Sequence, residues 1–251
     1  MIGCIVQARM NSSRLPGKVM MMMDDKYPVL YYVLKQLQST KLLSKIIIAT
    51  TTNPVDDVIV NYAKKHEIDF FRGDENDVLD RYHQCAIKFD LSTIVRIPSD
   101  KPLIDPTIVD NMISIFKKKS FDYVTNFLPL TFPSGTEVEI FSKSSLKEAW
   151  ENAYLPSERE HVTPYIYNNP KKFKIFNVIN KKDLSKFRWA VDRKEDLELV
   201  RKLVSSINER PILTSHILEQ IEKDPELFEI NKNVDYFEGI TKSLEKDKNF
   251  L

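Results

Sequence analysis

The chain has 251 residues, and 42% of them are hydrophobic, which is enough for one large α/β core or two small ones. Its 37 lysines and arginines nearly balance 36 aspartates and glutamates, so composition excludes a broad basic surface for nucleic acid or membrane. Two cysteines argue against a disulfide framework or a cysteine-based zinc site. The sequence shows no signal peptide and no apolar stretch of roughly 20 residues, so we expect a cytoplasmic protein.

The first part of the sequence alternates short apolar runs with longer amphipathic ones. The short runs predict strands at residues 3–6, 45–50, 68–71 and 93–98. The amphipathic runs between them predict helices at residues 28–38, 55–65 and 77–89. This alternation is typical of an α/β fold with a mostly parallel central sheet and helices on both faces.

The alternation becomes less regular after about residue 105. We predict further helices at residues 108–118, 144–153, 162–168, 195–208 and 212–223. We predict further strands at residues 123–126, 135–141, 173–178 and 189–191. Because no internal repeat or low-complexity linker interrupts the chain, we expect a single domain over residues 1–251. The second half would then extend the same sheet and carry a substrate lid or a dimer surface.

A basic loop, QARMNSSRLPGK, follows the first predicted strand. Ligands of open parallel sheets bind beyond the carboxyl ends of the strands, where this loop lies. It holds three cations, two hydroxyl side chains and a Pro-Gly turn, a composition suited to phosphate: Arg9, Ser12, Ser13, Arg14 and Lys18. It matches neither the mononucleotide P-loop nor the dinucleotide fingerprint. A solvated basic loop is the alternative, and the position after a strand favours a phosphate site.

Two aspartates are candidate magnesium ligands. Asp100 follows the strand predicted at residues 93–98, which places its carboxylate at the same edge of the sheet as the basic loop. Magnesium prefers oxygen ligands, commonly one or two carboxylates with substrate phosphates and water. Asp100 also fits a residue that opens a turn before Pro102. Asp192 closes a short apolar strand and precedes a helix, so it fits either a metal ligand or a helix cap.

Six segments in chain order resemble the cytidylyltransferase family of spore coat polysaccharide biosynthesis proteins, which is related to the acylneuraminate and ketodeoxyoctonate cytidylyltransferases. They are IVQARMNSSRLPGKV, ATTTNPVDD, FRGDENDVLDRY, VRIPSDKPLIDP, PSEREHVTPYI and RWAVDRKEDLELV. The resemblance extends from residue 1 to about residue 231. It implies a Rossmann-like, glycosyltransferase-A-type fold of the nucleotide-diphospho-sugar transferases. It also implies transfer of CMP from CTP to an acceptor, with release of pyrophosphate, in surface polysaccharide or glycan biosynthesis.

The resemblance assigns roles to individual residues. Arg14, Lys18 and Asp100 would be catalytic, and Mg²⁺ would bind Asp100 and Asp192. The CTP-binding half, residues 1–125, would contact the nucleotide through Gln7, Ala8, Arg9, Asn11, Ser12, Ser13, Arg14, Lys18, Asp77, Arg81 and Ser99. The chain departs from the family pattern at Lys101, where a small residue is usual, and at Ala190, where the sialate-activating relatives carry an acid.

The second half, residues 126–251, is expected to bind a small acidic or phosphorylated acceptor and to form a homodimer. The acceptor-binding candidates are Lys101, Glu137, Glu139, Glu158, Arg159 and His161. Glu137 and Glu139 alternate on one predicted strand and so share a face. His161 fits a general base or a hydrogen-bonding residue at a helix entry. Glu158 and Arg159 fit acceptor binding or a capping and ion-pair cluster.

Other functions remain open from the sequence. The alternatives are a nucleotidyltransferase that uses another NTP, a glycosyltransferase of the same fold, and a catalytically inactive nucleotide-binding regulatory protein. A glycosyltransferase would be expected to carry an Asp-x-Asp motif, whereas the segment Ser99-Asp100-Lys101 supplies one acid. The joint presence of Arg14, Lys18 and Asp100 favours an active transferase over the regulatory protein.

Overall fold

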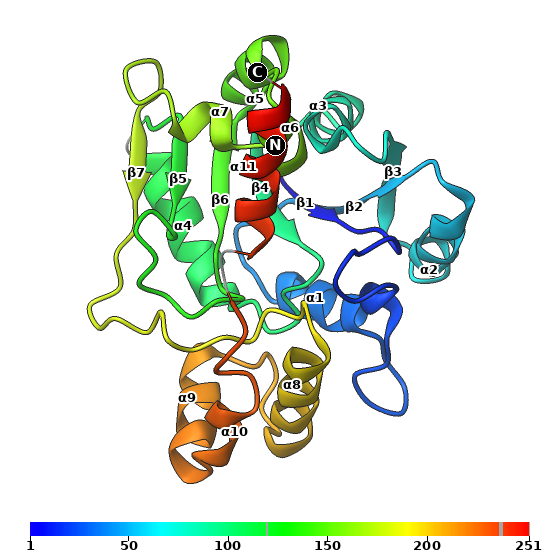
Figure 1. Cartoon of the computed structure of the whole chain (residues 1–251), viewed down its shortest axis with the longest axis vertical. Coiled ribbons are helices and arrows are strands. Elements are labelled where there is room, and N and C mark those ends of the chain that lie inside the picture. The colour runs from blue at the N-terminus through cyan, green and yellow to red at the C-terminus, as the bar shows by residue number, and fades with distance from the viewer. Residues whose placement is uncertain (119, 236–237, 251) are drawn as a thin grey trace.

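A computed structural model describes residues 1–118, 120–235 and 238–250 of the chain (Figure 1). Seven strands of the described residues form one sheet in the order β3-β2-β1-β4-β6-β5-β7. The strands are β1 (Ile2–Gln7), β2 (Lys45–Thr51), β3 (Asp69–Gly73), β4 (Thr93–Pro98), β5 (Tyr123–Thr125), β6 (Glu139–Ser142) and β7 (Ile175–Asn177). Strand β6 is antiparallel to both of its neighbours, and the remaining pairs are parallel. The sheet is therefore mostly parallel, as the alternation predicts.

Helices cover both faces of this sheet, and further helices lie beside it. They are α1 (Val29–Gln38), α2 (Asp57–Lys65), α3 (Val78–Lys88), α4 (Pro106–Lys118), α5 (Lys143–Asn152), α6 (Pro156–His161), α7 (Pro164–Tyr167), α8 (Lys194–Ser206), α9 (Thr214–Lys223), α10 (Glu226–Glu229) and α11 (Glu238–Phe250). Two short 3₁₀ helices, η1 (Lys18–Met20) and η2 (Pro54–Asp56), follow the first two strands.

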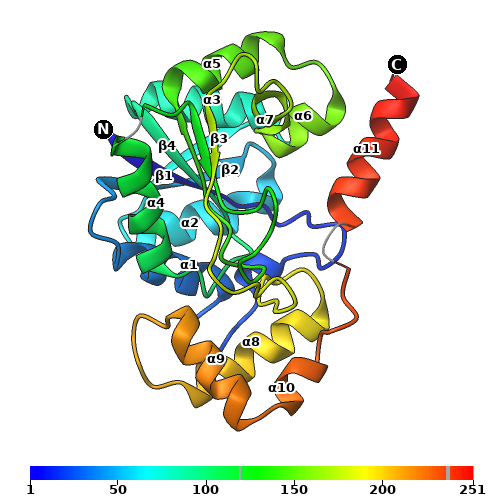
Figure 2. The same ribbon diagram turned by 90° about the vertical axis from the view of Figure 1, so that its left-hand side faces the viewer.

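The alternation of side chains along β1 divides the core. Cys4 and Val6 pack with apolar residues of α1, α2 and α4 on one face. Ile5, between them, packs with residues of α3, α5 and α7 on the opposite face. A third apolar cluster joins α8 and α9 to Trp189 and to Val29 of α1. Figure 2 shows α8, α9 and α10 as a separate layer below the sheet.

Three predicted elements differ from the structure for local reasons. The strand expected at residues 135–141 is limited to β6, because a turn at Gly135, with a φ of 104°, precedes it. The strand expected at residues 189–191 instead bridges two loops, through Trp189 to Ser134 and Val191 to Asp100. The helix expected at residues 162–168 is shortened to α7, because Val162 has a φ of 74°.

Helix α11 was not among the elements expected from the sequence, and it lies at the end of the described chain. Among the described residues, no helix is both long and apolar enough to cross a membrane.

Candidate active site

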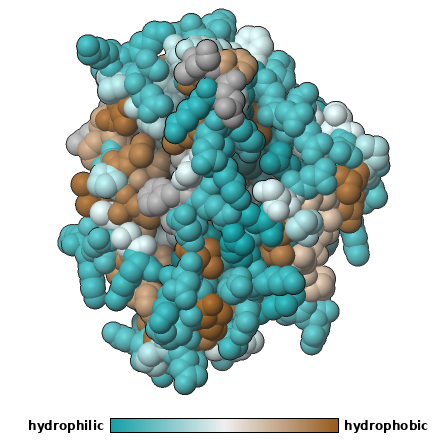
Figure 3. Space-filling view, in the orientation of Figure 1, coloured by the Kyte–Doolittle hydropathy of each residue, from teal (hydrophilic) through white to brown (hydrophobic). Residues whose placement is uncertain are grey.

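The cavity that contains most of the predicted site residues lies at the carboxyl ends of β1 and β4 and has a volume of about 450 Å³. Strand β1 lies between β2 and β4, so the chain connections diverge here, as at the ligand-binding crevice of open α/β sheets. In Figure 3 hydrophilic side chains gather along the middle of the face around this region. The predicted site residues that line the cavity are Gln7, Ala8, Arg9, Ser12, Ser13, Arg14, Lys18, Arg81, Ser99, Asp100 and His161.

The basic loop turns back on itself before η1 begins at Lys18. Gly17, with a φ of 74°, donates its backbone N–H to the carbonyl oxygen of Met10 at 2.7 Å. The backbone N–H of Met10 in turn donates to Asp56 Oδ1 at 2.7 Å, and the hydroxyl of Thr51 donates to the other oxygen of Asp56. The loop is thus fixed to the end of β2 without a ligand.

Lys18 is buried at one end of the cavity and holds three oxygen atoms. Its ammonium donates to Asp100 Oδ2 at 3.0 Å, to Asp192 Oδ1 at 2.8 Å and to the carbonyl oxygen of Val191 at 2.8 Å. Burial alone would lower the pKa of Lys18, but Asp100 and Asp192 outweigh it and raise that pKa above its ordinary value. Lys18 therefore stays protonated, and its ammonium has one fixed position.

Asp192 is surrounded by cations. Arg14 approaches Asp192 Oδ1 to 2.5 Å, beside Lys18, and Arg188 approaches Asp192 Oδ2 to 2.7 Å. Burial would raise the pKa of Asp192, but Lys18 and the two arginines hold it well below its ordinary range. Asp192 is consequently ionised and serves to orient Arg14 and Lys18.

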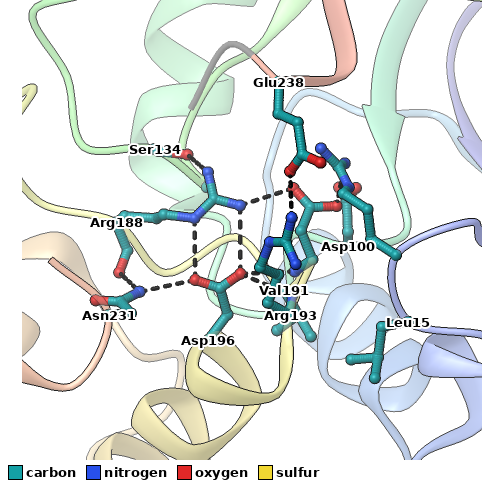
Figure 4. A network of polar contacts seen from close by, with 12 residues as sticks. Leu15, Asp100, Ser134, Arg188, Val191, Arg193, Asp196, Asn231 and Glu238 are labelled. Carbon is teal, nitrogen blue, oxygen red and sulfur yellow. Dashed lines mark hydrogen bonds and ion pairs between the residues drawn. The ribbon is translucent and has the colours of Figure 1, made fainter. Parts of the chain in front are cut away.

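Asp196 belongs to the same network of charged groups as Asp192 and Arg188. Its carboxylate pairs with Arg188 and accepts the backbone N–H groups of Asp192 and Arg193 at 2.9 Å (Figure 4). The side-chain amide of Asn231 donates to it at 2.8 Å. Asp196 is fully buried in the first turn of α8 and fixes the turn that carries Asp192.

The two predicted metal ligands differ in how far their oxygens are already occupied. Asp100 is 23% exposed, and of its two oxygens only Oδ2 has a partner among the described residues, the Lys18 ammonium. Both oxygens of Asp192 are taken by cations. In the described part of the chain no cluster of three or more metal-binding side chains occurs. Asp100 therefore fits a magnesium ion that takes its remaining ligands from phosphates and water, whereas Asp192 would first have to release Lys18 or Arg14.

Buried polar atoms without partners among the described residues also lie beside the cavity. Gln7 Oε1, Arg81 Nε and Arg96 Nε are each buried and make no hydrogen bond within the described residues. Arg81 is 1% exposed and donates one hydrogen bond, to the carbonyl oxygen of Asp74 at 2.9 Å. An unpaired buried polar atom costs about 1–3 kcal/mol. Three of them beside one cavity indicate a place for a polar ligand.

His161 lines the cavity from α6. Burial, and then the charge of Arg96, lower the pKa of His161 below its ordinary value, so the imidazole is neutral near pH 7. Its Nε2 lies 2.8 Å from the hydroxyl of Ser243 in α11. The neutral ring is able to accept a proton, as a general base requires.

Several predicted site residues lie outside the cavity because they have structural partners. Asp77 caps α3 by accepting the backbone N–H of Asp80 at 2.8 Å, and it pairs with Arg159. Asn11 donates to Glu75 at 2.8 Å on the surface. Asp77 and Arg159 therefore connect α3 to α6, and neither side chain lines the cavity.

The predicted acceptor-binding acids are likewise occupied. Glu137 precedes β6 rather than sharing a strand with Glu139, and it forms a buried ion pair with Lys101 at 2.9 Å. Glu139 pairs with Arg96 and accepts the hydroxyl of Tyr123 at 2.7 Å. The carboxylate of Glu158 accepts two backbone N–H groups at the start of α6, which is the capping role left open from the sequence.

Other lining residues were not among the sequence candidates: Arg96, Lys242, Ser243 and Lys246. Arg96 had a detectable signal, because it is a charge inside the apolar run TIVRIP of β4. The α11 residues recur at a spacing of three and four, which predicts one helical face. That face is polar, so a search for apolar periodicity passes over it.

Comparisons with known proteins agree with this geometry. Residues 3–240 match the model of the family described as cytidylyltransferase. The chain is 30% identical over 229 residues to the Bacillus subtilis spore coat polysaccharide biosynthesis protein SpsF, covering 88% of this chain and 94% of that protein. Among solved structures, a cytidylyltransferase from Leptospira borgpetersenii superimposes with a TM-score of 0.87 at 34% identity, over 93% of this chain and 98% of that chain.

A CMP:2-keto-3-deoxy-manno-octonic acid synthetase solved in complex with CTP is more distant. It has a TM-score of 0.61 at 15% identity, covering 82% of this chain and 98% of that chain, so it shows the shared fold alone. Together these matches confirm the predicted resemblance and the predicted fold class.

Proposed function

The chain belongs to the cytidylyltransferase family, and from that premise we propose that it transfers CMP from CTP to an acidic or phosphorylated sugar acceptor, releasing pyrophosphate. The observation that carries the proposal is the charge of the cavity. Among the described residues, seven lysines and arginines line it against two carboxylates: Arg9, Arg14, Lys18, Arg81, Arg96, Lys242 and Lys246 against Asp100 and Glu160. Such a cavity suits a polyanionic nucleotide.

The proposed reaction is an in-line displacement. An acceptor oxygen attacks the α-phosphorus of CTP, the bond from that phosphorus to the bridging oxygen breaks, and the electron pair leaves with pyrophosphate. Arg14 binds the β- and γ-phosphates and stabilises the charge that develops on the leaving group. Lys18 donates to Asp100, Asp192 and Val191 before the nucleotide binds, and it exchanges one of these contacts for a phosphate oxygen. Asp192 and Asp100 hold these cations in place before the nucleotide binds, which reduces the ordering required in the transition state.

Asp100 is the residue that would hold Mg²⁺ in this proposal, and a bound magnesium ion supplies charge neutralisation at the phosphate oxygens. The unpaired oxygen of its carboxylate supports this role. Asp192 was expected as a second ligand, but its contacts favour a role in positioning Arg14 and Lys18.

The nucleoside is placed by the polar atoms without partners. Gln7 and Arg81 carry hydrogen-bonding groups suited to the edge of a base, and both line the cavity together with Ser99. His161 is assigned to the acceptor, from which its neutral ring would take the proton of the attacking hydroxyl.

We also propose the homodimer expected from the sequence. Leu128 and Ile179 are 37% and 63% exposed in the second half of the chain. Figure 3 shows hydrophobic side chains gathered to the left of α11 on the same face. Exposed apolar patches of this kind mark association surfaces. Sedimentation equilibrium of the purified protein, which would show a single species at twice the chain mass, tests this part of the proposal.

The experiment that tests the function supplies purified protein with CTP, UTP, GTP or ATP, with magnesium, and with a panel of acidic and phosphorylated sugars. Pyrophosphate release and the nucleotide-sugar product are followed together. We expect release with CTP and one class of acceptor, and its loss when magnesium is chelated.

Other outcomes would redirect the proposal. Equal release with another NTP would contradict the assignment of cytidine. Sugar transfer from a nucleotide sugar, without pyrophosphate, would indicate a glycosyltransferase. Tight CTP binding without turnover across the acceptor panel would favour a nucleotide-binding regulatory protein.

A further inference from the structure

Helix α11 lies across the cavity but is not part of the layers that cover the sheet. Figure 2 shows it standing apart from the other helices, and it packs against α6. The family match ends at residue 240, so most of the helix lies beyond the matched region. Four of its residues nevertheless line the cavity: Gly239, Lys242, Ser243 and Lys246.

These four positions form one face of the helix, since they are spaced by three and four residues. A helix that docks only for packing places apolar residues on such a face. This face carries glycine, serine and two lysines instead. Its composition is that of a surface built to contact a polar, negatively charged ligand.

The helix is fixed to the cavity by contacts outside the two lysines. Asp247 Oδ1 accepts the backbone N–H of Ser157 at 2.8 Å, and the hydroxyl of Ser243 lies 2.8 Å from His161. Glu238, at the start of the helix, pairs with Arg193 at 2.7 Å. The lysines are therefore held at the cavity by contacts that they do not make themselves.

The first turn of α11 lies against the basic loop, residues 7–18. A Cβ atom added at Gly239 would lie 3.3 Å from Arg14 Nη1. Lys242 follows Gly239 within one helical turn. The ammonium of Lys242 approaches Glu238 to 2.7 Å, and that of Lys246 approaches Glu160 to 3.2 Å. Both side chains are 62% exposed.

A lysine ammonium has three donors, so each of these groups keeps donors free for a ligand while one carboxylate holds it at the rim. We propose that Lys242 and Lys246 bind the phosphates of the nucleotide substrate and so extend the grip of Arg14 and Lys18. The identity of the ligand rests on the proposed function. The geometry of α11 adds a binding element that the matched family region does not contain.

The test uses the full-length protein and isothermal titration with CTP and, separately, with inorganic pyrophosphate, at several salt concentrations. The double variant Lys242→Ala/Lys246→Ala is compared with Lys248→Ala, which removes a lysine of the same helix that does not line the cavity. We expect the double variant to bind both ligands about tenfold more weakly, with a shallower salt dependence. We expect Lys248→Ala to bind like the wild type and Lys242→Arg/Lys246→Arg to retain most of the affinity.

Each outcome separates this inference from the proposed function. A double variant that binds as tightly as the wild type overturns the inference and leaves the proposed function intact. Weaker binding with an unchanged salt dependence also overturns it, since the lysines would then act through the position of the helix rather than through contact with phosphate. A wild type that binds neither CTP nor pyrophosphate refutes the proposed function and the inference together.

Discussion

The two ends of the cavity use charge in opposite ways. At the loop end, defined by Arg14, Lys18 and Asp100, the cations have acidic partners before any ligand arrives. At the helix end, defined by Gln7, Arg81 and Arg96, buried polar atoms have no partner within the described residues. A paired network fixes groups for chemistry, whereas unpaired groups gain most when a matching ligand binds. The comparison assigns phosphate binding and stabilisation of the leaving group to the loop end, and recognition of the nucleoside to the helix end.

The largest expected effect tests the loop end. Asp100→Asn keeps the shape of the side chain but removes the charge expected to hold magnesium. We expect kcat/KM for CTP to fall by on the order of 10³-fold in a pyrophosphate-release assay, because charge stabilisation in the transition state is lost. The free energy of unfolding should change little, since the side chain is partly exposed. Asp25→Asn, on the surface, is the control, and an Asp100→Asn enzyme with activity within tenfold of it would contradict the assignment.

The second prediction concerns the buried ion pair between Glu137 and Lys101, the residue that follows Asp100. Glu137→Gln leaves the buried ammonium of Lys101 without its counter-ion, so we expect the free energy of unfolding to fall by about 3 kcal/mol at pH 7. Burial would raise the pKa of Glu137, but Lys101 outweighs it and lowers that pKa below its ordinary value. The stability from the pair is therefore complete above about pH 4.3, the pKa of an unfolded glutamate, and is lost as pH falls through the lower folded pKa.

Urea unfolding of the wild type and the variant between pH 7 and pH 3 measures this effect. The difference in the free energy of unfolding between wild type and Glu137→Gln should become smaller in the acid range. The control Glu222→Gln should unfold with a free energy close to that of the wild type at every pH. A difference in the free energy of unfolding that grows on acidification would contradict this prediction.

The third prediction tests the helix end. Gln7→Leu removes an amide that has no partner in the described structure, so stability should hold or rise while CTP binding weakens by about tenfold. Titration calorimetry with CTP and UTP, alongside thermal unfolding, measures both quantities. Gln38→Leu, away from the cavity, provides the matched control. Unchanged CTP affinity in Gln7→Leu would remove Gln7 from the recognition end.

The smallest expected effect distinguishes a structural carboxylate from a binding one. Asp77→Ala removes the cap of α3 and should lower the free energy of unfolding by about 1 kcal/mol, with CTP affinity unchanged. Asp77→Asn keeps a capping group while losing the charge that pairs with Arg159, so it should recover most of this stability. Weaker CTP binding in both variants would return Asp77 to the nucleotide site.

How much of the site could be predicted depended on distance along the chain. The loop from Gln7 to Lys18 is contiguous, and its position after an apolar strand was enough to mark a phosphate site. The pairing of Lys18 with Asp192 spans 174 residues, and no local pattern contains it. Asp192 has the same local setting as a helix cap, and only its three cationic neighbours distinguish a positioning role from a metal ligand.

The acidic residues of the second half show the same limit. Glu137 and Glu139 alternate in sequence as acceptor-binding residues would, but each is neutralised by a cation from the first half of the chain, Lys101 and Arg96 respectively. The spacing of residues in the sequence predicts the direction in which a side chain points, but it does not predict which partner the fold places beside that side chain. Helix α11 escaped prediction for a related reason, because its inward face is polar and contacts a cavity rather than the core.

The sequence by itself determined the alternating strands and helices, the basic loop and the family. Those features depend on periodicity and short motifs, which are local properties of the chain. Tertiary structure alone decided which carboxylates are free and which are paired, and it placed α11 over the cavity. Charge pairing depends on burial and on contacts between distant segments, so it becomes fixed only when the sheet brings those segments together.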